Sequence, residues 1–142
     1  MTPSAPRFTP AEALAEIDRA VELLAAPDPV AASRAAFALA SIPSGDPDAR
    51  VLVSALGARI YDNLRGLKSL TSRVAPGRAD ALTLMSIAVV NLTSAMACRR
   101  MIVVVWPRNP RLPDIDRRIA EAVPVVRAVV HAMADTRAAA ST

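Results

Sequence analysis

Residues 81–106 read ALTLMSIAVVNLTSAMACRRMIVVVW. No charged residue occurs before the pair Arg99-Arg100, and a second apolar run follows that pair. An uncharged run of about 18 residues reaches the lower limit for a membrane-spanning helix, and it is also typical of a central helix in a bundle. The choice between these two structures determines whether the chain folds in a bilayer or around a core of its own.

The polar residues of this run favour the bundle. Ser86, Thr93 and Arg100 recur every seven residues, which places them along one side of a helix. The apolar sequence also continues beyond the arginine pair, which a membrane span would not need. We therefore predict a central bundle helix over residues 78–106 and do not expect a membrane span. We expect Asn91 to bond to a neighbouring helix, because an unpaired buried amide is costly.

A capping box predicts where the first helix begins. In Thr9-Pro10-Ala11-Glu12, the Thr9 hydroxyl can accept the backbone N–H of Glu12, and Glu12 can accept the N–H of Thr9. Pro10 stands at the first helical position, where its missing N–H does no harm. A helix over residues 10–25 follows from this signal.

Two Asp-Pro pairs, at residues 28–29 and 46–47, repeat the combination of a cap and a proline. They predict helices over 29–42 and 47–74. Ala75-Pro76-Gly77 ends the second of these, so residues 47–74 and 78–106 should form a long antiparallel hairpin.

A last helix is predicted over residues 114–137, with a kink or break near Glu121 because Pro124 lies inside it. The sequence thus predicts an all-α fold, a single-domain antiparallel bundle of about five helices over residues 1–142. Residues 1–8 and 138–142 are expected to be flexible tails.

Composition limits the class of protein. Of the 142 residues, 53% are hydrophobic but only 3% aromatic, so each helix buries small side chains. The single cysteine, Cys98, excludes an internal disulfide and a cysteine zinc site. The first residues lack the basic and apolar pattern of a secretory signal. We expect a cytoplasmic protein.

The net charge of +4 is unevenly distributed. Residues 1–48 hold three arginines and seven acids, a balance of −4, whereas residues 49–142 hold fourteen basic groups and six acids, a balance of +8. This asymmetry indicates either an acidic partner or attraction between the two parts of the chain.

The residues that catalysis requires are scarce. His131 is the only histidine, which excludes a histidine-rich metal site. The cations beside Cys98 could lower its thiol pKa, but burial as a small apolar residue is the favoured interpretation. We predict no enzyme activity, no cofactor and no metal. Gly57 and Gly66 lie inside a predicted helix, and close approach by another helix is the expected reason.

The segment from Trp106 to Pro113 is the candidate binding surface. Its prolines at 107, 110 and 113 have the period of a polyproline II helix, which would hold the segment extended. The alternative is an ordinary connection between two helices. The candidate partner-binding residues are Arg99, Arg100, Trp106, Arg108, Arg111, Arg117 and Arg118.

Three functions are compatible with these observations. The first is a non-catalytic helical interaction or structural module that self-associates or binds a protein through its apolar surface. The second is a nucleic-acid-binding accessory protein that uses the arginines between residues 99 and 118. The third, least favoured, is a small-ligand site in which Asn91, Ser94, Cys98 and His131 converge on a cavity.

Overall fold

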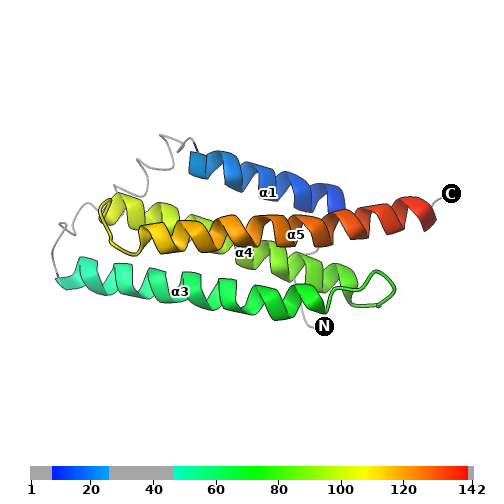
Figure 1. Ribbon diagram of the computed structural model, residues 1–142, viewed down its shortest axis with the longest axis horizontal. Helices are drawn as coiled ribbons and strands as arrows, with labels where there is room; N and C mark the ends of the chain where they lie inside the picture. The colour runs from blue at the N-terminus through cyan, green and yellow to red at the C-terminus, as the bar shows by residue number, and fades with distance from the viewer. Residues whose placement is uncertain (1–7, 26–46, 141–142) are drawn as a thin grey trace, which may run out of the picture.

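The computed structural model describes residues 8–25 and 47–140, which form four helices (Figure 1). These are α1 (Pro10–Ala25), α3 (Pro47–Ser72), α4 (Ala81–Val105) and α5 (Leu112–Ala140). The described residues contain no strand, which confirms the all-α prediction. Their helices number one fewer than predicted, because the predicted helix 29–42 lies outside the described residues.

The helix ends lie close to the predicted positions. Helix α1 covers the predicted residues 10–25, and α3 begins at Pro47 as its proline indicated. Helix α5 begins two residues earlier than predicted and continues to Ala140, so residues 138–140 extend the helix. At the other end, Phe8 donates its backbone N–H to Ser86 Oγ at 2.8 Å. Phe8 and residues 138–140 therefore do not belong to flexible tails, so both tails are shorter than predicted.

Helices α3 and α4 form the predicted antiparallel hairpin, and α5 returns antiparallel to α4 (Figure 1). Helix α1 runs parallel to α4 and packs on both α4 and α5. Helix α4 contacts each of the other three described helices, whereas α1 and α3 do not contact each other. It is therefore the central helix, as the sequence predicted.

The core surrounds α4. Met85, Val89 and Leu92 of α4 are fully buried, in one cluster with Ile17 of α1 and Ile60 of α3. Length and composition alone would allow α4 to cross a membrane, since its most apolar window has a mean hydropathy of 1.7. In this structure 56% of that window is buried by the protein itself.

The capping box of α1 forms as predicted. Thr9 donates its backbone N–H to Glu12 Oε1 at 3.0 Å, and Glu12 donates its backbone N–H to Thr9 Oγ1 at 3.1 Å. The Thr9 backbone N–H, followed by the Thr9 hydroxyl, holds the pKa of the Glu12 carboxyl below its usual range, because both favour the ionised carboxylate.

No break occurs near Glu121, where the sequence predicted a kink or a break. Helix α5 is continuous from Leu112 to Ala140 with Pro124 inside it. Pro124 cannot donate to the carbonyl of Ala120 one turn earlier, but both residues are exposed, so water can reach that carbonyl. The missing hydrogen bond therefore lies on the solvent side of the helix.

The expectation about the two glycines of α3 is also wrong. A Cβ atom added at Gly57 or Gly66 would meet no atom within 4 Å, so no helix approaches closely at either glycine. Asn91 is half-buried, and the predicted bond from its side chain to a neighbouring helix does not form among the described residues.

The open space beside Gly66 gives a stability prediction. Gly66→Ala should raise the free energy of unfolding by about 0.5–1 kcal/mol, because alanine favours the helix and displaces no atom. Urea denaturation followed by circular dichroism measures the change. Gly77→Ala, which is equally open but lies outside the helices, should give a smaller gain. A loss of stability in Gly66→Ala would contradict this assignment.

Candidate functional site

The segment between α4 and α5 folds into two consecutive tight turns. Asn109 donates its backbone N–H to the Trp106 carbonyl at 3.1 Å, and Leu112 donates to the Asn109 carbonyl at 3.1 Å. Pro107 and Pro110 occupy the second position of these turns, where proline is favoured. The predicted extended polyproline conformation is therefore wrong, because Pro107 and Pro110 each help to close a turn and Pro113 lies in α5.

Asn109 holds the second turn in place. Its side-chain Oδ1 accepts the backbone N–H of Arg111 at 2.9 Å, and the residue is only 7% exposed. At the start of the segment, Trp106 donates its backbone N–H to the Ile102 carbonyl at 2.7 Å and so ends α4. The Trp106 side chain remains partly exposed.

Asp114, in the first turn of α5, gathers three donors. It accepts hydrogen bonds from Tyr61 Oη at 2.9 Å, from Arg118 Nε at 2.9 Å, and from Arg117. The two arginines and the tyrosine lower the pKa of Asp114 from 3.8 to about 2. The Arg118 guanidinium also lies 5.1 Å from the centre of the Tyr61 ring, within the range of a cation–π interaction.

Arg99 is likewise held by a carboxylate. Its Nε and Nη2 donate to the two oxygens of Asp116 at 2.8 and 3.2 Å, a bidentate pair that joins α4 to α5. Arg117 has a second acceptor in Glu121 at 3.1 Å. Three of the predicted binding residues, Arg99, Arg117 and Arg118, are therefore engaged by acids of α5.

The other three arginines do not form one group. Arg100, Arg108 and Arg111 make no ion pair with any side chain that the structure describes. Arg108 and Arg111 are exposed on the two turns, whereas Arg100 is half-buried against α1. The predicted cluster is thus divided between two locations.

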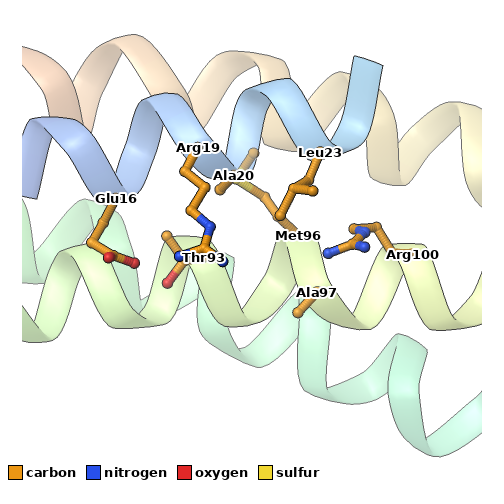
Figure 2. A pocket seen from close by; sticks show the side chains of 8 residues that line it. All are labelled: Glu16, Arg19, Ala20, Leu23, Thr93, Met96, Ala97 and Arg100. Carbon is orange, nitrogen blue, oxygen red and sulfur yellow. The ribbon is translucent and has the colours of Figure 1, made fainter. Parts of the chain in front are cut away.

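The first location is a groove of about 180 Å³ between α1 and α4 (Figure 2). Arg19 extends from α1 toward Thr93 of α4, with Glu16 on one side and Arg100 on the other. Ser86 and Thr93 both lie on the α1 side of α4, as the seven-residue spacing predicted. The polar side of α4 therefore faces the acidic first helix.

The second location is a pocket of about 250 Å³ where α3 begins, α4 ends and α5 begins. We call it the Trp106 pocket. Trp106, Asn109 and Arg111 contribute from the turns, and two further polar side chains, Arg50 and Ser54, contribute from α3. The remaining lining residues are Val53, Gly57, Ile102, Pro110 and Ile115.

Sequence reasoning identified Trp106 and Arg111 but missed the α3 side of this pocket. Arg50, Val53, Ser54 and Gly57 follow one another at intervals of three, one and three residues, which places them on one face of a helix. Gly57 was the available signal for this side of the pocket. A glycine inside a helix lowers helix stability relative to alanine, so its presence calls for an explanation.

The four residues of the predicted interior ligand site do not converge. Cys98 is buried in the core, and burial raises its thiol pKa, with Arg59 opposing the shift. This confirms its interpretation as a small apolar residue. His131 is exposed on α5, and none of the four, including Asn91 and Ser94, lines either pocket. In the part of the chain with described positions, no group of acids, cysteines and histidine could hold a metal ion.

The uneven charge is partly satisfied within the molecule. Arg127 of α5 donates to Asp18 of α1, across 109 residues of sequence. This pair links the acidic and basic parts of the chain. Attraction between these parts was one of the two explanations for the uneven charge.

No known protein family, curated protein or solved structure matches the chain.

The Asp114 cluster predicts a pH dependence of stability. Because the folded-state pKa of about 2 lies below the ordinary value of 3.8, ionised Asp114 stabilises the fold above about pH 4, and this contribution disappears as the pH falls toward 2. Asp114→Asn should be less stable than the wild type at pH 6, and the difference should shrink between pH 4 and 2.5. Chemical denaturation at several pH values measures it.

Asp62→Asn is the control for this series, because the Asp62 pair with Arg65 is long, at 3.9 Å, and exposed. It should change stability much less than Asp114→Asn. A difference between wild type and Asp114→Asn that stays constant down to pH 2.5 would contradict the role assigned to the ionised carboxylate.

Proposed function

We propose that the protein is a cytoplasmic, non-catalytic helical module that self-associates through the outer face of α4. The supporting observation is a row of uncharged residues at helical spacing on this helix. We call it the outer stripe. It consists of Thr83, Ile87, Val90, Ser94, Ala97 and Met101.

The outer stripe is the part of α4 that the described helices leave incompletely covered. Ala97 is exposed and the other members are half-buried, whereas Leu92 and Met96 on the opposite side are fully buried. Because α1 and α3 do not contact each other, no described helix bridges the two across α4. A continuous uncharged surface of this kind is typical of an interface.

The dimensions of the stripe suit a second helix. From Thr83 to Met101 it extends about 27 Å, at 1.5 Å per residue. Ser94 and Ala97 near its middle are small, so a second helix could pack at about 8 Å between axes, the near end of the usual range. Small residues at the centre and larger ones toward both ends make the stripe compatible with a copy of itself.

The charges beside the stripe favour a second copy of this chain as the partner. Glu16 and Arg19 line the same groove as Thr93 and Ala97, so they lie level with the middle of the stripe. If two copies pack with their α4 helices antiparallel about this level, the twofold axis places Glu16 of each copy opposite Arg19 of the other. The rim would then be complementary in charge without any additional partner.

The nucleic-acid alternative has weaker support. Arg99, Arg117 and Arg118 are already paired with carboxylates, which reduces the positive charge available for phosphates. Arg100 lies in the groove beside α1, away from the two turns. Arg108 and Arg111 are the members of the predicted cluster that remain exposed on the turns.

Self-association predicts a solution mass of two chains. Light scattering behind size exclusion, at tens of micromolar protein, should give twice the mass of one chain. Ala97→Glu should give a monomer, because it places two carboxylates at the centre of an uncharged interface without entering the core. Ala128→Glu, at an exposed position on α5, should remain dimeric. A monomeric wild type at 100 µM would contradict the proposal.

The proposed orientation is tested by exchanging the rim charges. Glu16→Arg and Arg19→Glu should each weaken the dimer about tenfold, because each places like charges opposite one another. The double variant that carries both changes should recover wild-type association. Additive weakening in the double variant would exclude the antiparallel arrangement, and circular dichroism verifies that each variant is folded.

A further inference from the structure

The Trp106 pocket has a polar lining that supplies hydrogen-bond donors and positive charge. Arg50 and Arg111 each bring a guanidinium, and the described residues that line the pocket include no acid. Neither arginine makes an ion pair with a side chain that the structure describes. Guanidinium groups offer donors only, so the matching group on a ligand must be an acceptor, and an anion suits it best.

Asn109 adds hydrogen-bond donors to the same lining. The residue is 93% buried, since its exposed fraction is 7%, and its Oδ1 is occupied by the N–H of Arg111. Its side-chain amide nitrogen donates to no described residue, and because no buried side-chain nitrogen or oxygen among the described residues lacks a partner, this nitrogen is accessible to solvent. Because Asn109 lines the pocket, this nitrogen provides two further donors beside the arginines.

The opposite part of the lining is apolar. Ile102 and Ile115 are fully buried and Val53 is 4% exposed, so the pocket reaches the bundle core. The Trp106 ring contributes a flat apolar surface at the edge. Gly57 keeps the α3 side open, because a Cβ at this position would meet no atom within 4 Å. A larger residue at position 57 would occupy the space.

We propose that the Trp106 pocket binds a small organic carboxylate with an apolar body. Arg50, Arg111 and the Asn109 amide hold the carboxylate, and the body lies between Trp106 and the isoleucines. The volume of about 250 Å³ is below the range of drug-sized sites and fits a ligand with a single ring or a short branched chain. The pocket is formed by one chain, so this site does not depend on the proposed self-association.

Trp106 itself reports binding, because it is the only tryptophan in the chain. The full-length protein is titrated with phenylacetate, 4-methylpentanoate and the neutral phenylacetamide at constant ionic strength, and tryptophan emission is recorded. At least one of the two carboxylates should change the emission in a saturable way and bind at least about tenfold more tightly than phenylacetamide, since bonds to charged groups are the stronger ones. Phenyl phosphate tests a phosphate head with the same ring.

Two variants test the location. Gly57→Leu should abolish the saturable response by filling the pocket, and the matched Gly66→Leu, elsewhere on α3, should preserve it. Arg111→Gln should weaken carboxylate binding at least about tenfold, which keeps the test valid if Gly57→Leu fails to fold. Ala97→Glu should bind as the wild type does, which separates this site from the proposed interface.

Three results would overturn the proposal. They are the lack of a saturable response to both carboxylates, an equal response to phenylacetamide, and an unchanged response in folded Gly57→Leu. Tighter binding of phenyl phosphate than of phenylacetate would replace the carboxylate assignment with a phosphate one.

Discussion

Helix α4 carries apolar side chains on nearly every side, and these must be buried by other helices. The rest of the structure follows from how this burial is achieved. Helices α3 and α5 adjoin α4 in the sequence, and short turns fold both of them back onto it. Helix α1 covers a third side from a distant part of the chain. The outer stripe remains between α1 and α3. The proposed interface is thus the part of the α4 surface that the described helices leave uncovered.

The sequence predicted the helices whose signals are local. The Thr9 capping box, the proline at the start of α3 and the Ala75-Pro76-Gly77 stop act through neighbouring residues, so no tertiary information was needed. The sequence could not decide between a kink and a break near Glu121, because the cost of Pro124 depends on which side of α5 faces water. Whether the unbonded carbonyl faces solvent or the core depends on the tertiary structure. The spacing of residues around Pro124 does not determine it.

The candidate site was only partly predictable for a related reason. Trp106 and Arg111 stood out by residue type, and the prolines around them marked a connection. The division of the arginines into paired and unpaired groups depends on the register between α4 and α5, which brings Asp116 to Arg99. Arg50 joins the Trp106 pocket from a helix more than fifty residues earlier, and no local pattern connects the two.

The attachment of α1 affects the order in which the chain can acquire its structure. Its described links to α4 and α5 include Phe8 to Ser86 and Asp18 to Arg127, separated by 78 and 109 residues. Helix α3 packs on α4, and α4 packs on α5, so these contacts close short loops and form early. During synthesis, α1 leaves the ribosome before the other three described helices, and its contacts cannot form until α4 and α5 have been made. Its capping box can hold its first turn while its apolar side awaits the other helices.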